Sequence, residues 1–349
     1  MGKKGGLWTL AGTAVGVGAG LAAQRSMVQR RRRNDPEAAE RFGERRGERS
    51  SYVQTPDGAT LFLEETGPPS TSGVVFIHGS VLRTDTWYYQ LPGLGDHRLV
   101  FYDLRGHGLS HPKGDSDFTI QTLAEDLELV IQDRGLEEVV VVGHSVGGMI
   151  ALQLCVQRSD LLGSTIKGLV LTNTTHRPAY ETLLGGGAVA RIERLARRPL
   201  DVIGSQHASV AALRKIIKPS NSLFMAVSLA AFGPDASARQ IDYTYDMLAE
   251  TPTDVIFDLF KAYRDFDVTD SLGQIDVPAL VIGGTHDRLT VLQASKHLAE
   301  KMPNARLEIF SGCGHMTMLE RHREFNALLG GFFDDVLGVR SSGREEVGT

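Results

Sequence analysis

The feature that most constrains the fold is an alternation of short apolar runs with longer helical segments, which begins after residue 51. Two extended runs flank Asp57-Gly58, which is a hairpin signal. Residues 119–134 carry apolar side chains at helical spacing between two later runs. This order predicts an α/β domain with a mostly parallel sheet and helices on both faces. The strand-like runs after the hairpin are 74–77, 99–102, 139–142, 168–172, 279–282 and 306–310.

The runs 168–172 and 279–282 are separated by a long interval, Thr172 to Ala279, that contains no convincing central strand. It spans about a hundred residues with helix-type patterning. An insertion that follows a core strand lies above the carboxyl ends of the sheet, where open α/β folds bind ligands. We therefore expect a helical cap. The predicted helices of the cap are 187–197, 208–217 and 251–263. The predicted core comprises 52–174 and 271–337, the predicted cap is 175–270, and 338–349 is predicted to be a disordered tail.

The sequence GHSVG at 143–147 stands directly between an apolar strand and a helical run. A G-x-S-x-G turn needs small residues on either side of the serine because the backbone there is strained and crowded. The helix that follows adds an electropositive end beneath a developing oxyanion. This context predicts that Ser145 is a nucleophile.

A serine hydroxyl is a weak nucleophile, so it needs a base and a group that orients the base. The turn GTHD at 284–287 follows the strand ALVI, and the turn GCGH at 312–315 follows the strand LEIF. We predict His315 as the base and Asp287 as the acid. Serine, then acid, then histidine is the chain order expected for α/β folds that carry a G-x-S-x-G nucleophile turn. The other strand end that could supply an acid reads TNT at 172–174 and carries no carboxylate.

Residues 52 to about 336 resemble the α/β-hydrolase superfamily, within its branch of cap-bearing esterases and lipases. Besides the serine turn, HGS at 78–80 is similar to the oxyanion loop of that family, and DLRGHGLS at 103–110 is similar to its D-x-R-G-x-G-x-S turn. The resemblance implies an eight-stranded, mostly parallel sheet with an inserted helical cap. It also implies that the backbone N–H groups of Ser80 and Val146 form an oxyanion hole.

The function that the resemblance implies is hydrolysis of a carboxylic ester through an acyl-enzyme, with a small, moderately apolar or lipid-like ester as substrate. No metal or cofactor is expected. Serine at the nucleophile position argues against epoxide hydrolases and haloalkane dehalogenases, which use aspartate there. Similar triads also run C–C bond hydrolysis, acyl transfer and cofactor-free haloperoxidase chemistry, and these remain alternatives. A non-enzyme alternative is a membrane-tethered binding protein that keeps a hydrolase shell.

Charge is distributed unevenly along the chain, whose formal net charge is −5. Residues 1–50 hold eleven Lys or Arg and five Asp or Glu, whereas the remainder holds 26 basic and 37 acidic residues. An acidic main domain makes nucleic acid a poor candidate partner. The two cysteines, Cys155 and Cys313, match no metal-ligand spacing or redox motif.

The amino-terminal residues suggest a membrane anchor. Leu7 to Ala23 form a stretch of seventeen uncharged residues, about the minimum for a span, and Arg25 and the run 30–33 follow it. The heavier positive flank predicts an outward amino terminus, membrane association through residues 7–33 and a cytoplasmic catalytic domain. The alternative is a cleaved signal peptide and an exported enzyme. Residues 34–51 are dense in mixed charge and predict a solvated helix or linker, so that 1–51 forms an anchor and linker region.

Overall fold

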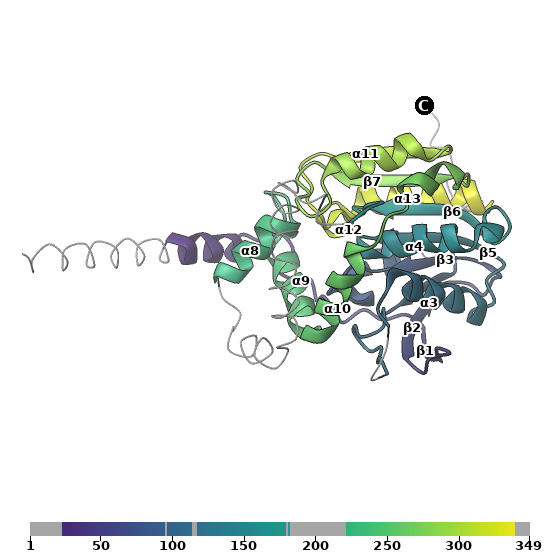
Figure 1. Cartoon of the computed structure of the whole chain (residues 1–349). Coiled ribbons are helices and arrows are strands. Elements are labelled where there is room, and N and C mark those ends of the chain that lie inside the picture. Colours follow the sequence, from purple (N-terminus) through teal and green to yellow (C-terminus); the bar gives the residue numbers. More distant parts are fainter. Residues whose placement is uncertain (1–22, 95, 114–116, 179–180, 182–220, 339–349) are drawn as a thin grey trace, which may run out of the picture.

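An eight-stranded sheet forms the centre of the protein (Figure 1). The computed structural model describes residues 23–94, 96–113, 117–178, 181 and 221–338. The strand order is β1-β2-β4-β3-β5-β6-β7-β8. β1 with β2 and β2 with β4 are antiparallel, and the other neighbouring pairs are parallel, which confirms the predicted sheet. The strands are β1 Arg49–Gln54, β2 Thr60–Thr66, β3 Ser72–Ile77, β4 Leu99–Tyr102, β5 Glu138–His144, β6 Ile166–Thr172, β7 Ala279–Gly284 and β8 Ala305–Phe310.

Each apolar run singled out in the sequence lies within one of these strands, and the predicted hairpin joins β1 to β2. Gly58 lies in the hairpin turn with φ 91°, a backbone conformation that favours glycine, and its amide donates to the Thr55 carbonyl at 2.9 Å. The helices are α2 Gln90–Gly93, α3 Ile120–Asp133, α4 Val146–Gln157, α8 Asn221–Ala231, α9 Ala238–Glu250, α10 Thr253–Arg264, α11 Leu292–Lys301, α12 Thr317–Glu320 and α13 His322–Leu337, with short 3-10 turns η1 Thr84–Trp87, η2 Ser159–Leu161 and η3 Thr269–Gln274.

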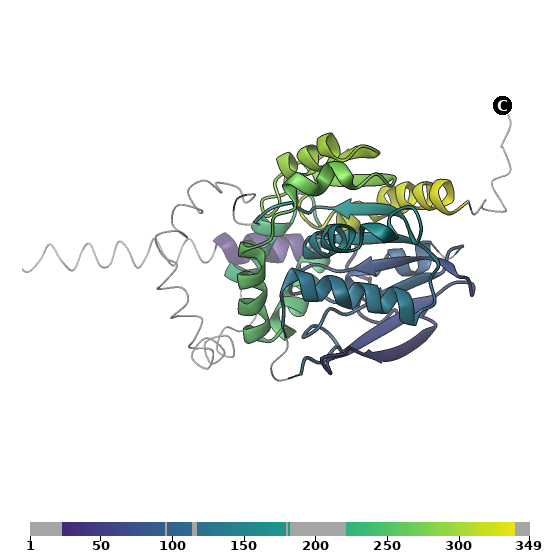
Figure 2. The ribbon, with the colours of Figure 1, turned by 45° about the vertical axis from the view of Figure 1, so that its right-hand side comes forward.

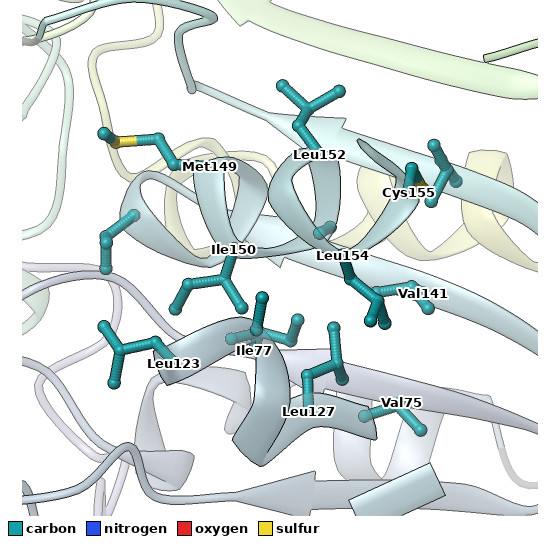
Figure 3. Close-up of a cluster of buried hydrophobic side chains, with 14 of the residues drawn as sticks. Val75, Ile77, Leu123, Leu127, Val141, Met149, Ile150, Leu152, Leu154 and Cys155 are labelled. Carbon is teal, nitrogen blue, oxygen red and sulfur yellow. The ribbon is translucent and has the colours of Figure 1, made fainter. Parts of the chain in front are cut away.

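The central strands are buried on both faces because alternate side chains point into two separate hydrophobic clusters. In β3, Val75 and Ile77 belong to the cluster under α3 and α4, whereas Val74 and Phe76 belong to the cluster under α13. Figure 3 shows the first cluster, in which Leu127 of α3 and residues of α4 meet the strands. Continuous apolar runs without alternation are what such doubly covered strands require.

Helix α3 confirms the helix predicted over 119–134. Thr119 is its N-cap, and the hydroxyl of this residue accepts a hydrogen bond from the Thr122 amide. The helix ends before Gly135, whose φ of 61° is left-handed. Its apolar side faces the sheet, and Asp126 also points inward, where it meets a cation described below.

In the described residues, the cap consists of α8, α9 and α10, which lie together at one end of the strands (Figures 1 and 2). They stand between β6 and β7 in the chain, where the sequence predicted an insertion of helices. The helix predicted over 251–263 corresponds to α10. The helices predicted over 187–197 and 208–217 lie outside the described residues. The limits of 175 and 270 for the cap, and of 338 for the tail, stay a prediction.

The arginine run contacts the cap. Helical residues 23–33 lie beside α8 (Figure 1). Arg31 donates to the Ser228 hydroxyl and to the Ala236 carbonyl, both at 2.8 Å. Arg32 forms a bidentate pair with Asp242 of α9, with N–O distances of 2.9 and 2.7 Å. These two guanidinium groups thus bind cap helices.

The predicted membrane placement is wrong. Of the helices in the described parts of the chain, none has both the length and the apolar character needed to cross a bilayer. The uncharged stretch 7–23 lies outside the described residues except for Ala23. The residues on which the signal-peptide alternative depends lie outside them as well. We retain neither the membrane association through residues 7–33 nor the cytoplasmic topology drawn from it.

Residues 34–48, predicted as a solvated helix or linker, are largely exposed but make specific contacts with the cap. Phe42 is only 8% exposed and stacks on Tyr243 of α9 with ring centroids 4.8 Å apart. Asp35 accepts hydrogen bonds from the Ser237 hydroxyl and from the Arg239 amide at the start of α9. A charged sequence can be ordered when its charges meet partners on another element, which composition does not reveal. We refer to residues 23–48 as the N-terminal segment.

Candidate active site

Ser145 lies in the tight turn between β5 and α4. Its backbone has φ 54° and ψ −119°, which is costly for a residue with a side chain. A Cβ atom on Gly143 would overlap the backbone of Gly147, and one on Gly147 would overlap the backbone of Ile77 in the neighbouring strand. Glycine is therefore required at both positions, and this crowding is the physical reason for the G-x-S-x-G spacing.

Hydrogen bonds from the end of β6 hold the turn in this conformation. The Ser145 amide donates to the Thr172 carbonyl at 3.0 Å. The Thr174 hydroxyl donates to the Ser145 carbonyl at 2.6 Å. Ser145 is half-buried, so the strained turn leaves this residue partly accessible at the end of β5.

Asp287 and His315 lie in the turns after β7 and β8, and the structure brings them together. The Nδ1 atom of His315 is 2.9 Å from Oδ2 of Asp287. An ionised carboxylate only accepts hydrogen bonds, so Nδ1 carries the proton and Nε2 is left with a lone pair. That arrangement orients an imidazole to act as a base.

The Asp287 carboxylate is 5% exposed and fully engaged. Oδ1 accepts from the amides of Leu289 and Thr290 at 2.8 and 2.9 Å, while Oδ2 accepts from the Thr290 hydroxyl and the Asn173 side-chain amide, both at 2.8 Å. Burial opposes ionisation, yet the neighbouring His315 and these hydrogen bonds outweigh it and lower the pKa of Asp287. The group is a carboxylate at neutral pH.

His144 connects the serine turn to the His315 loop. Its Nε2 lies 2.9 Å from the His315 carbonyl oxygen, and the two rings are 4.7 Å apart. Burial, together with the nearby His315, lowers the pKa of His144 to about 3. The ring is therefore neutral and donates this hydrogen bond from Nε2. Ser145 consequently lies next to His315 through its own chain neighbour, although in the described residues no hydrogen bond joins the Ser145 hydroxyl to the His315 ring.

The predicted oxyanion loop packs against the serine turn. A Cβ atom on Gly79 would come within 3.1 Å of the Ser145 Cβ, which places the neighbouring Ser80 beside the nucleophile turn. Val146 is the first residue of α4, where helix amides have no intrahelical acceptor. Neither the Ser80 nor the Val146 amide has a protein acceptor among the described residues. Both amides are free to bind a ligand oxygen.

Two further histidines support the oxyanion loop from within. Nε2 of His78 accepts from the Leu104 amide at 2.9 Å, and Nε2 of His107 accepts from the Val81 amide at 3.2 Å. Val81 has φ 58°, an unusual conformation for a β-branched residue. Burial lowers the pKa of His107 to about 4, so its ring stays neutral and can accept this bond. These histidines hold backbone amides in place and do not face Ser145.

Arg105 has a structural role, as its position in the 103–110 turn suggests. This residue is 1% exposed and forms a bidentate pair with Asp126 of α3 at 2.6 and 2.7 Å. It also pairs with Asp57 of the β1–β2 hairpin at 2.7 Å. The guanidinium joins three separate elements, the 103–110 turn, the β1–β2 hairpin and α3.

Asn173 is a site residue that sequence reasoning did not identify. It follows β6 at the strand end where an acid was sought, and its φ of 47° is left-handed. Its amide nitrogen donates to Asp287, and its oxygen accepts from the Thr317 hydroxyl at 2.8 Å. A polar residue at that strand end was the available signal, but it supports the acid and does not replace it.

No group of three or more His, Cys, Asp or Glu side chains that could hold a metal ion occurs in the described residues. A surface pocket of about 420 Å³ is lined by Lys167, Asn304, Arg306 and residues of α13. It lies at the opposite ends of β7 and β8 from Asp287 and His315. This pocket is therefore remote from the chemistry described above.

The fold and the strained serine turn define a hydrolase of the α/β type. Residues 74–322 match the family model of the alpha/beta hydrolase fold, and the chain belongs to this family. A non-heme chloroperoxidase from Streptomyces lividans is 28% identical over 279 residues, which cover 78% of this chain and 95% of that protein. An α/β-hydrolase superfamily protein from Bacillus subtilis is 24% identical over 80% of this chain and 98% of its own length.

Solved structures agree on the fold. An esterase from Exiguobacterium antarcticum matches with a TM-score of 0.65 and 22% identity, covering 81% of this chain and 98% of that chain. At this level of identity the likeness shows a shared fold only. It supports the same arrangement of sheet and helices that the strand order describes.

Proposed function

We propose that the protein is a serine hydrolase that cleaves carboxylic esters with Ser145 as nucleophile, His315 as base and Asp287 as orienting acid. The observation that carries the proposal is the hydrogen-bonded Asp287–His315 pair, which adjoins a strained serine turn through His144. Similarity to an esterase fold and to hydrolase-family proteins supports the reaction class.

The reaction then proceeds in two stages. His315 Nε2 takes the Ser145 proton as the serine oxygen attacks the ester carbonyl, and the imidazolium passes that proton to the leaving alcohol. Water, activated by the same base, releases the acid and regenerates the serine. The amides of Ser80 and Val146 stabilise the oxyanion in both stages, and one such donor is typically worth about 3 kcal/mol.

The substrate we favour is a small, moderately apolar ester. The cap supports this choice because its residues include apolar side chains such as Phe224, Phe232 and Ile241, which lie in the same hydrophobic cluster as Cys313 and Met316 of the His315 loop. The acyl chain length of the substrate is tested with a series of p-nitrophenyl esters.

A cofactor-free haloperoxidase activity is the second candidate, favoured by the match to a chloroperoxidase. Comparison of ester turnover with peroxide-dependent halogenation, and with cleavage of a vinylogous diketone, separates the candidates.

Labelling with a fluorophosphonate probe tests the nucleophile directly. We expect the wild type to be labelled at one serine and the Ser145→Ala variant to be unlabelled and to lose ester turnover by roughly 10⁴-fold or more. Ser164→Ala, at an exposed serine outside the site, is the matched control and should behave like the wild type. Equal labelling of Ser145→Ala would refute the proposal. Inertness of the wild type to every serine-directed probe would favour a binding protein with a hydrolase shell.

A further inference from the structure

Glu320 ends α12, five residues after His315, and its carboxylate joins two parts of the protein. Oε1 accepts a hydrogen bond from the Gly314 amide in the His315 loop at 2.8 Å. Oε2 accepts one from the Gly233 amide at 2.8 Å, and Gly233 lies in the cap turn between α8 and α9. One side chain thus bridges the base loop and the cap.

The two backbones that Glu320 joins approach each other very closely. A Cβ atom on Gly233 would overlap the Gly312 carbonyl, and one on Gly314 would overlap the backbone of Phe232. The Ala231 carbonyl at the end of α8 also accepts from the His315 amide at 2.8 Å. The backbone of the base is therefore seated directly on the last turn of a cap helix.

We infer that Glu320 is a positioning residue that fastens the His315 loop to the α8–α9 turn and thereby makes the placement of the base depend on the seating of the cap. This inference rests on the proposed role of His315. Glu320 itself does not touch the reacting atoms, because both of its carboxylate oxygens are directed at backbone amides.

The tie is strongest when the carboxylate is ionised. Two N–H donors face the two oxygens, so a proton on either oxygen would weaken the hydrogen bond from the amide that faces it. Burial, partly offset by the two amide hydrogen bonds, raises the pKa of Glu320 to about 7. The charge of Asp287 opposes ionisation of the Glu320 carboxyl, whereas His315 favours it. Burial and the charge of Glu320 raise the pKa of the neighbouring Cys313 thiol. The tie is complete above pH 7, and it loosens as the pH falls through that value.

The first test compares Glu320→Gln with wild-type enzyme over a range of pH. A glutamine offers one acceptor oxygen, so one amide loses its partner at every pH, and we expect kcat to fall roughly tenfold at pH 8. The wild-type acid limb of log kcat against pH should contain a step from Glu320, and the variant should lack that step. Glu324→Gln, at an exposed carboxylate paired with Arg321, is the matched control.

The second test needs no catalysis. Cys313-Gly314 is the only Cys-Gly dipeptide in the sequence, so labelling cysteine carbonyl carbon and glycine nitrogen yields one NMR signal for the Gly314 amide. We expect this signal to titrate near pH 7 in the full-length wild type and to stop titrating there in Glu320→Gln. The Gly233 amide signal should titrate with it.

The outcomes separate this inference from the proposed function. A Gly314 signal that is flat between pH 5 and 9 in the wild type would overturn the tie, even if the variant fails to fold. Unchanged kcat and pH profile in a folded Glu320→Gln that still reacts with the fluorophosphonate would overturn the positioning role alone. Coincident titration of Gly314 in a wild type that neither labels nor turns over esters would keep the tie and refute the hydrolase assignment.

Discussion

Asp287 gathers two backbone amides, a hydroxyl, a side-chain amide and the His315 ring around one buried carboxylate. At the scale of single residues, this crowding fixes both the ionisation of the acid and the direction of the histidine ring. A neutral side chain of the same shape would satisfy only part of these donors.

Asp287→Asn should therefore reduce kcat for p-nitrophenyl acetate by about 10⁴-fold, because the amide would favour the wrong imidazole tautomer. The fold should survive, since the shape is kept. Asp267→Asn is the matched control, because that exposed carboxylate also accepts from a backbone amide but lies outside the site. A variant within tenfold of wild type, with an unchanged melting temperature, would show that Asp287 does not orient the base.

Single residues differ in how far the sequence reveals them. Ser145, Asp287 and His315 each follow a strand in a short glycine-containing turn, so position in the chain was enough to propose them. Asn173 and Glu320 could not be proposed in this way. Their roles depend on contacts with Asp287, Gly233 and Gly314 that exist only once distant segments have met.

At the scale of elements, Arg105 joins the 103–110 turn to the β1–β2 hairpin and to α3 through Asp57 and Asp126. Burial raises the pKa of Asp126, although Arg105 opposes this rise. Removing the cation alone would leave a carboxylate buried without its counter-ion. The pair therefore matters more for the junction of these elements than an exposed pair would.

Arg105→Met should destabilise the protein by about 3–5 kcal/mol in urea unfolding, and Arg105→Met combined with Asp126→Leu should recover most of that loss. Arg158→Met is the control, because Arg158 pairs with Glu128 and Asp160 at the surface and its loss should leave the urea unfolding midpoint nearly unchanged. Additive losses in the double variant would contradict a coupled pair.

The elements that the sequence predicted well are those with a strong periodic signal. Continuous apolar runs predicted the central parallel strands, because strands covered on both faces need no polar positions. The edge strand β8 differs, since it contains Arg306 and Glu308 and is only partly buried. The antiparallel hairpin was visible from Asp57-Gly58. Residues 34–48 lacked any periodic signal, and their order depends on Phe42 and Asp35 meeting α9, which no local pattern encodes.

At the scale of the whole molecule, the N-terminal segment lies across the cap. Arg31 and Arg32 contact α8 and α9, and both guanidinium groups also lie over the Phe224 ring, at 5.8 and 5.2 Å from its centroid. The positive run that suggested a membrane topology thus has partners within the protein. Composition alone could not distinguish these two uses of arginine.

Replacing Arg31 and Arg32 by alanine should loosen the cap without unfolding the sheet. We expect backbone amides of α8 and α9 to exchange roughly tenfold faster in hydrogen–deuterium exchange, while β3 and β5 stay protected. Arg33→Ala is the matched control, because Arg33 is exposed and, in the described residues, its side chain makes no hydrogen bond. Unchanged exchange in α8 and α9 would show that the segment does not hold the cap.

The turn between α8 and α9 is held at two points, by Arg31 at Ala236 and by Glu320 at Gly233. A foreign cap grafted onto this core to alter substrate choice would lack the residues that Arg31 and Glu320 contact. The His315 loop would then lose its hydrogen bonds to the cap. Such a graft would have to carry the N-terminal segment with it and keep a glycine opposite Glu320.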